Sequence, residues 1–431
     1  MDDLSARLDA VWRIEGASVV AALTRMTGDV ATAEDCASEA LVAALRQWGE
    51  SGVPRNPGAW LTAVAKRRAI DGWRGGERAE ARDRQLAHLQ AGEVAPESES
   101  ISDDELRLLF VSCHPVLSRE SQVALTLRVV GGLSTTEIAR LLLTSVATVQ
   151  ARITRAKKTL SAASVPFATP APDEWDARLA AVLAVVYLIF TEGYASTTGT
   201  ELLRPHLARE ALRLGRMLAA LTPAEPEVHG LVALMELQSS RFAARVDARG
   251  DAVLLSDQDR SRWDVTQIRR GREALARADS LGHGRGPYAL QAAIAACHAC
   301  APSVESTDWE TIVVLYEALG RLTGNPVVAL NRAIAVSMVS GPEAGLASVE
   351  QVADSRGLRG SHLLPSVRGE LLTQLGRTAE AASELRAAAD LAANDRVAGS
   401  LRSRAEALSS IAPTSAESRH SRGLSTKYTY E

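Results

Sequence analysis

The chain has 431 residues, a length that predicts several compact domains, each able to bury a core of its own. Apolar residues make up 46% of the chain and aromatic residues only 4%, a balance that favours helices over strands. The formal net charge of −4 excludes a chain that is basic overall, so a nucleic-acid surface would need local clusters of positive charge. We therefore expect an all-α protein of several domains.

Cysteine usage and hydropathy indicate the compartment. The four cysteines are unevenly spaced, and no apolar run of about 18 residues is present. We expect a cytoplasmic protein without disulfides, membrane spans, metals or cofactors. Cys297 and Cys300 have C-x-x-C spacing, but no second ligand pair lies near them, so small buried cysteines are favoured over a metal or redox site.

Residues 1–78 are predicted to form three helices. Apolar residues recur at three- and four-residue spacing over residues 3–27 and again over residues 30–48. The loop Gly49–Gly58 contains two prolines and three glycines, and a third helix is expected from Pro57, since proline suits the first helical turn. These helices form the first predicted unit.

Two linkers separate three predicted units. Residues 79–104 are polar and strongly acidic, and we expect them to form a linker because they cannot bury enough apolar surface to fold alone. Residues 105–163 form a second small helical unit, and the Pro-rich residues 164–174 form a second linker.

Residues 175–411 contain amphipathic helices separated by short turns. The stretch "RGELLTQLGRTAEAASELRAAADL", residues 368–391, fits the tetratricopeptide pattern, and residues 325–352 are a looser version of it. We therefore expect an array of helical hairpins, followed by a disordered tail over residues 412–431.

The run from Leu133 to Leu160, "LSTTEIARLLLTSVATVQARITRAKKTL", predicts two short helices. Ser134 or Thr135 can cap the first helix, whose Glu137 falls in the first turn, and Thr144 or Ser145 can cap the second. On the second helix one face is apolar, formed by Val149, Ile153, Ala156 and Leu160. The opposite face carries Thr148, Gln150, Arg152, Arg155 and Lys158.

This arrangement suits a helix-turn-helix, in which an apolar seam holds the second helix while a cationic face enters the major groove of DNA. Arg and Lys attract phosphates of any sequence, whereas Gln and Arg can also contact base edges. The alternative interpretation is a solvated basic face on a packing helix.

The same run resembles the C-terminal DNA-binding module of sigma factors of the extracytoplasmic-function group. The matching residues are Leu133-Ser134, Glu137-Ile138-Ala139, Thr148-Val149, Arg152 and Arg155-Ala156. Leu143 departs from the family, which has Gly or Asn in the turn. The resemblance implies that the −35 promoter element is bound by Ser134, Thr135, Thr148, Gln150, Arg152, Arg155, Lys157 and Lys158.

The N-terminal unit resembles the same family. Residues 32–48 are similar to the helix by which sigma factors hold the polymerase clamp, which implies polymerase binding by Glu34, Asp35 and Glu39. Residues 59–74, "AWLTAVAKRRAIDGWR", are similar to the helix that opens the −10 element. The residues implied there are Arg55, Asn56, Trp60, Lys66, Arg67, Arg68, Asp71, Trp73, Arg74 and Arg78. For Trp60, core packing is favoured over base stacking.

The third region is similar to the C-terminal extension of a sigma-factor subgroup with tetratricopeptide-like repeats, through stretches such as "YLIFTEGYASTTG" at Tyr187–Gly199. Glu192, Gly193 and Tyr194 form a candidate regulatory turn. The favoured alternative is a glycine that ends a helix beside a packed tyrosine.

Taken with the resemblance, the sequence predicts a sigma factor. Its expected partners are the clamp and flap of core RNA polymerase and promoter DNA, with an intramolecular or protein partner for the C-terminal domain that would modulate activity in cis. A stand-alone helix-turn-helix regulator with a ligand- or peptide-sensing helical array is the alternative. An enzyme using His206, His283 or His298 is disfavoured, since no nucleophile or metal ligands accompany these residues.

Overall fold

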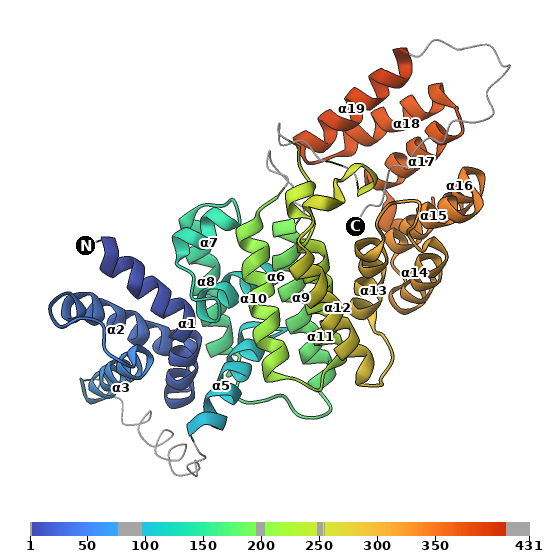
Figure 1. The fold of residues 1–431 in the computed structure, drawn as a ribbon. Helices are drawn as coiled ribbons and strands as arrows, with labels where there is room; N and C mark the ends of the chain where they lie inside the picture. Colours follow the sequence, from blue (N-terminus) through green and yellow to red (C-terminus); the bar gives the residue numbers. More distant parts are fainter. Residues whose placement is uncertain (1, 76–96, 195–202, 248–252, 254, 411–431) are drawn as a thin grey trace. The chain divides into compact units, whose positions relative to one another are not determined.

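The computed structural model describes residues 2–75, 97–194, 203–247, 253 and 255–410 (Figure 1). Every regular element in these ranges is a helix and none is a strand, which confirms the predicted all-α fold. The chain forms two compact units, residues 1–189 and 190–431, and the boundary falls within the helix α9 (Trp175–Tyr194).

Unit 1 begins with three helices that pack against one another, α1 (Asp2–Thr27), α2 (Val30–Ser51) and α3 (Pro57–Gly75). Asp29 caps α2 by accepting a hydrogen bond from the backbone N of Thr32 at 2.9 Å. Alanines dominate the buried face of α2, because small side chains allow the neighbouring helices to approach closely. The three helices predicted for residues 1–78 are therefore present.

Four further helices complete the described part of unit 1 before α9. They are α5 (Glu97–Ser112), α6 (Arg119–Val129), α7 (Thr135–Leu141) and α8 (Val146–Ala162). Helix α8 packs on α6 and α7, while α5 packs on both α6 and α1 (Figure 1). Helix α5 thereby contacts both the N-terminal three helices, through α1, and α6, on which α8 packs.

The acidic stretch is partly helical, and this corrects the linker predicted over residues 79–104. Helix α5 begins at Glu97, eight residues before the predicted unit at 105–163. Asp104 is buried, where it forms ion pairs with Arg25 of α1 at 3.1 Å and Arg107 at 2.8 Å. These two cations offset only part of the cost of burying the carboxylate, because burial outweighs them and raises the pKa of Asp104. Residues 79–96 of the predicted linker lie outside the described residues.

Helix α9 is the one helix in the described ranges that is long and apolar enough to cross a membrane. Half of its most apolar window is buried inside the protein. At its start Trp175 packs edge to face on Phe110, with ring centroids 5.2 Å apart, and Arg178 donates to the backbone O of Phe110 at 2.9 Å. These contacts make α9 a core helix of the fold.

Unit 2 is built from helices that pack on their neighbours in the sequence (Figure 1). After the end of α9 the α-helices are α10 (Pro205–Leu221), α11 (Pro226–Ser239), α12 (Val265–Ser280), α13 (Pro287–Cys300), α14 (Trp309–Thr323), α15 (Pro326–Ser340), α16 (Pro342–Glu350), α17 (Leu363–Gln374), α18 (Thr378–Leu391) and α19 (Asp395–Ser410). Short 3₁₀ helices lie at Phe242–Ala244, Leu255–Asp257, Arg260–Arg262 and Arg356–Leu358.

Glycines allow close helix packing within unit 2. A Cβ on Gly369 of α17 would lie 2.9 Å from the Leu385 side chain of α18, and one on Gly345 of α16 would lie 2.6 Å from Cβ of Ser337 in α15. Successive helices therefore pair as predicted for helical hairpins. A tetratricopeptide-like geometry for these pairs stays a prediction, and the tail predicted over 412–431 lies outside the described residues.

Candidate nucleic-acid and polymerase interface

The pair α7 and α8 has the local structure of a helix-turn-helix. Ser134 and Glu137 form a capping box: the backbone N of Glu137 donates to Ser134 Oγ at 3.2 Å, and the backbone N of Ser134 donates to Glu137 Oε2 at 2.8 Å. Ser145 caps α8 by accepting from the backbone N of Thr148 at 3.0 Å. Both helices therefore begin at the residues where the sequence predicts caps.

The turn between the two helices is closed by backbone hydrogen bonds around Leu143. The backbone N of Thr144 donates to the O of Ala139 at 3.0 Å, and that of Leu143 donates to the O of Arg140 at 3.4 Å. This pattern needs a left-handed residue after the helix end, usually Gly or Asn. Leu143 occupies that position with a φ of 48° and an exposed side chain. The turn is therefore kept despite the departure noted in the sequence, at a cost in backbone strain.

The predicted apolar seam of α8 is confirmed. Its four members, Val149, Ile153, Ala156 and Leu160, are all buried, and α8 packs on α6 and α7. The seam fixes the rotation of α8 about its axis, which in turn decides which side chains face solvent.

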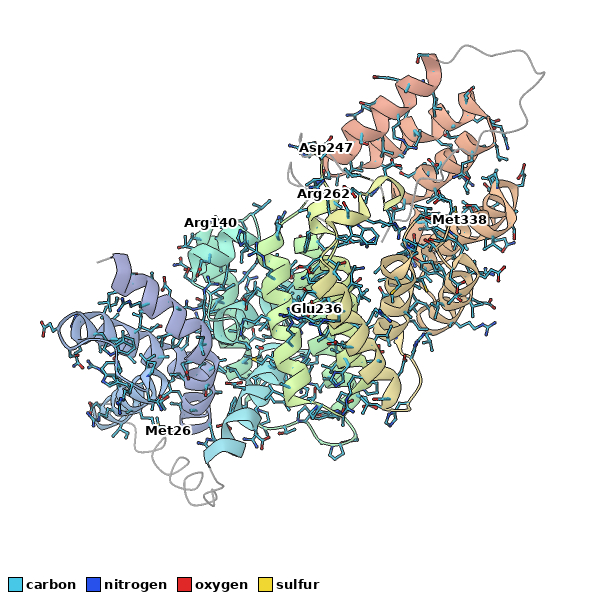
Figure 2. All side chains as sticks on the ribbon, viewed as in Figure 1. Met26, Arg140, Glu236, Asp247, Arg262 and Met338 are labelled. Carbon is cyan, nitrogen blue, oxygen red and sulfur yellow. The ribbon has the colours of Figure 1, made fainter. Side chains whose placement is uncertain are left out.

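The opposite face of α8 is exposed and cationic. Thr148, Gln150, Arg155 and Lys158 are exposed, and Arg152 is half-buried. Gln150, Arg155 and Lys158 line a shallow groove of about 830 Å³ together with Val116 from the loop before α6. Within the described residues no carboxylate pairs with Arg155 or Lys158. On α7, Arg140 adds another exposed cation, which Figure 2 labels.

Two residues predicted to bind the −35 element are engaged in contacts within the protein in this structure. Lys157 points away from the exposed face, and its ammonium forms ion pairs with Glu34 and, at 3.7 Å, with Asp35 of α2. The Ser134 hydroxyl is engaged with the Glu137 carboxylate at 2.8 Å. Thr135 is half-buried. Lys157 in particular is not available to DNA in this conformation.

Glu34, predicted to bind polymerase, is buried between two cations. Its carboxylate accepts a hydrogen bond from Arg128 Nε of α6 at 2.5 Å and contacts Lys157 of α8. Burial raises the pKa of the Glu34 carboxyl, but the charges of Arg128 and Lys157 and their hydrogen bonds outweigh burial, so the pKa lies below its ordinary value. Asp35 and Glu39, the other two predicted residues, are exposed.

The loop before α3 presents polar groups to solvent. Arg55 and Asn56 are exposed, and Asn56 caps α3 by accepting from the backbone N of Ala59 at 3.0 Å. Trp60 is half-buried and packs edge to face on Trp48, with ring centroids 5.3 Å apart. This contact agrees with core packing, the favoured interpretation for Trp60.

Helix α3 carries the other residues predicted to bind the −10 element. Arg67, Arg68 and Asp71 are exposed, and Lys66 is half-buried. Nε of Arg68 lies 3.7 Å from Oε2 of Glu39 in α2. This exposed ion pair contributes little to stability in water. The side chains of Trp73 and Arg74, and the whole of Arg78, lie outside the described residues.

The turn predicted at Glu192–Tyr194 is wrong, because all three residues are helical in α9, and a regulatory role for them stays a prediction. Gly193 is buried, and a Cβ there would lie 2.4 Å from the backbone N of Ala208 in α10. Tyr194 stacks on Phe190 and accepts a hydrogen bond from Arg241 Nη2 at 2.6 Å. The close approach of α9 and α10 explains the glycine. The contacts of Tyr194 agree with the packed tyrosine of the favoured alternative.

One expectation about unit 2 changes, and one ion pair there is new. Cys300 is exposed and Cys297 is only partly buried, so the prediction of two buried cysteines is wrong for Cys300. Glu236 in α11 is buried in an ion pair with Arg216 of α10, a contact that the sequence did not indicate (Figure 2). Among the residues that the structure describes, no group of three His, Cys, Asp or Glu side chains could hold a metal ion.

Sequence reasoning missed Arg128, the principal partner of Glu34. One signal was available: Glu34 falls on the apolar face of α2, among Ala33, Ala37 and Ala40, where a carboxylate needs a buried cation. The identity of that cation could not be predicted, since Arg128 is 94 residues away in the sequence.

Comparisons with known proteins match three stretches of the chain to families. Residues 14–79 match the family described as Sigma-70 region 2, and residues 107–160 match Sigma-70, region 4. Residues 178–279 match a family of unknown function, DUF6596. The chain is 45% identical over 404 residues to the uncharacterized protein R00370 of Rhizobium meliloti (strain 1021). The matched stretch covers 92% of this chain and 94% of that protein. No solved structure matches the chain.

Proposed function

We propose that this protein is a sigma factor of the extracytoplasmic-function group and acts in the cytoplasm. The chain belongs to one family with the rhizobial protein, and its sigma-70 regions 2 and 4 make it an RNA polymerase sigma factor. Residues 1–78 hold the polymerase clamp and open the −10 element, and residues 105–163 read the −35 element beside the flap. Catalysis belongs to the polymerase. The observation that carries this proposal is the exposed cationic face of α8, directed outward by the buried seam.

Reading of the −35 element is assigned to the N-terminal and middle parts of α8. Gln150 and Arg155 are exposed and can form paired hydrogen bonds with adenine or guanine edges. Lys158 follows on the same face and suits a backbone phosphate. The groove that Val116 shares with these residues extends the contact surface beyond the helix-turn-helix.

Opening of the −10 element is assigned to the loop at Arg55 and Asn56 and to the exposed cations of α3. Single-stranded DNA needs cations for its backbone and a rigid support for displaced bases. The packing of Trp60 on Trp48 supports that rigidity by anchoring the start of α3 to α2.

We propose further that the C-terminal helices modulate activity in cis, with a tetratricopeptide-like surface for a protein partner. A truncation that tests this role should end after Ile189 and so keep most of α9, since Trp175 and Arg178 pack on Phe110 within unit 1. Unchanged promoter-dependent transcription by the truncated chain, both with purified polymerase and in cells, would remove the regulatory role.

The sigma-factor function is tested with purified core polymerase and the full chain. We expect the pair to produce transcripts with defined start sites on a genomic DNA library, and sequencing these transcripts gives the promoter. Glu39→Lys should weaken binding to core polymerase, because it reverses an exposed charge on the clamp-type helix. Sequence-specific DNA binding by the chain alone, without any affinity for core polymerase, would instead favour a stand-alone regulator.

A further inference from the structure

Within unit 1, the surface proposed for polymerase and the helices proposed for DNA are held together by ion pairs. Glu34 of α2 lies between Arg128 of α6 and Lys157 of α8, with Asp35 3.7 Å from Lys157. Only 9% of the Glu34 side chain and 14% of that of Lys157 are exposed, so both charges are largely removed from water. Isolated ion pairs on a protein surface contribute little to stability. The Glu34 carboxylate is instead largely buried and is held by two cations at once.

A second set of contacts joins α1 to the same helices. Arg13 of α1 forms an ion pair with Glu137 in the first turn of α7. At Gly132, just before α7, a Cβ would lie 3.3 Å from the backbone O of Trp12. These ion pairs open at lower cost than an apolar core, and the packing of α1 on α5 is a separate contact between the two regions.

We propose that Glu34, Arg128 and Lys157 form an ion-pair latch that closes region 2 onto region 4 in the free protein and must open before core polymerase binds. This inference rests on the proposed polymerase-binding role of α2. In the closed state Glu34 cannot reach polymerase, and Lys157 is not available to DNA. Polymerase and the latch therefore compete for the same carboxylate, so latch strength lowers the apparent affinity for polymerase.

Carbodiimide cross-linking of the unmodified full chain tests whether the latch forms. The reagent joins a carboxylate to an amine in direct contact, and the chain has few lysines: Lys66, Lys157, Lys158 and Lys427. We expect an amide between Lys157 and Glu34 or Asp35, identified by mass spectrometry, and none between Lys158 and α2, because Lys158 faces solvent. Saturating core polymerase should abolish the cross-link.

A variant of Arg128 tests whether the latch limits polymerase binding. Arg128 lies outside every residue set assigned above to DNA or polymerase. Arg128→Gln removes one cation from Glu34, and Arg128→Lys is the matched control, since it changes the same side chain but keeps the charge. We expect Arg128→Gln to bind core polymerase about tenfold more tightly than Arg128→Lys and to cross-link less. Circular dichroism of both variants checks that the helices are intact.

The possible results separate the latch from the proposed function. Absence of the cross-link in the free chain, or a cross-link that bound polymerase leaves unchanged, overturns the latch. Equal affinities of the two Arg128 variants for polymerase also overturn it. If neither wild type nor either variant binds core polymerase, the proposed function fails, whatever the cross-link.

Discussion

Nε of Arg128 in α6 donates a 2.5 Å hydrogen bond to the carboxylate of Glu34 in α2, across 94 residues of sequence. The contact joins two segments that match different sigma-70 regions, and Lys157 of α8 forms a second ion pair with Glu34. A residue implied in polymerase binding is therefore part of the internal structure of the free chain.

The first prediction concerns the pH dependence of this carboxylate. The pKa of Glu34 is lowered in the folded state from its ordinary value of 4.5, so its contribution to stability is present above pH 4.5 and is lost as pH falls through the folded pKa. Glu34→Gln should lower the free energy of unfolding by about 2 kcal/mol at pH 7. Thermal unfolding of both proteins from pH 7 to pH 3 measures the difference, which should shrink below pH 4.5. A difference that stays constant over this range would show that Glu34 is not ionised in its site.

The second prediction concerns the strained turn. Leu143 holds a φ of 48° with an exposed side chain, so Leu143→Asn should stabilise the protein by about 1 kcal/mol through relief of left-handed strain. Leu143→Ala is the control, because it shortens the side chain but keeps the Cβ that causes the strain. Scanning calorimetry should give a higher unfolding temperature for the Asn variant alone, by about 3 °C. Equal gains in both variants would attribute the effect to loss of the exposed apolar group.

The third prediction uses two glycines in unit 2. Gly193→Ala places a Cβ 2.4 Å from the backbone N of Ala208, which cannot move as a flexible side chain can, so we expect a loss of about 3 kcal/mol or more. Gly399→Ala in α19 has nothing within 4 Å and should instead gain up to about 1 kcal/mol from helix propensity. Chemical denaturation measures both. A tolerated Gly193→Ala would mean that α9 and α10 are less closely packed than described.

The fourth prediction separates affinity from sequence readout on α8. Lys158→Ala should weaken DNA binding about equally for all sequences and lower the slope of log affinity against log salt by about 1. Gln150→Ala should instead reduce discrimination at one base pair by about 1–3 kcal/mol. Arg272→Ala, which removes an exposed cation from α12, is the control for net charge. Holoenzyme binding to promoter and mutated promoter DNA at several salt concentrations gives both quantities.

Much of unit 1 could be predicted from local pattern. The spacing of Val149, Ile153, Ala156 and Leu160 set the buried face of α8, and Ser134 with Glu137 marked the start of α7, because helix periodicity and capping depend on residues within one or two turns. The same logic failed where burial is decided by distant partners. Asp104 was assigned to a linker by its acidic neighbours, yet Arg25 of α1 stabilises it in a helix.

The sequence by itself determined the helical class, the caps, the helix-turn-helix and its cationic face, since each follows from short-range spacing and side-chain chemistry. Only the tertiary structure decided which charges on that helix are available. Arg155 and Lys158 face solvent, whereas Lys157, between them in the sequence, is held by Glu34 of α2. The physical reason is that a buried charge needs a partner of opposite sign, and folding alone brings α2 and α8 within reach of each other.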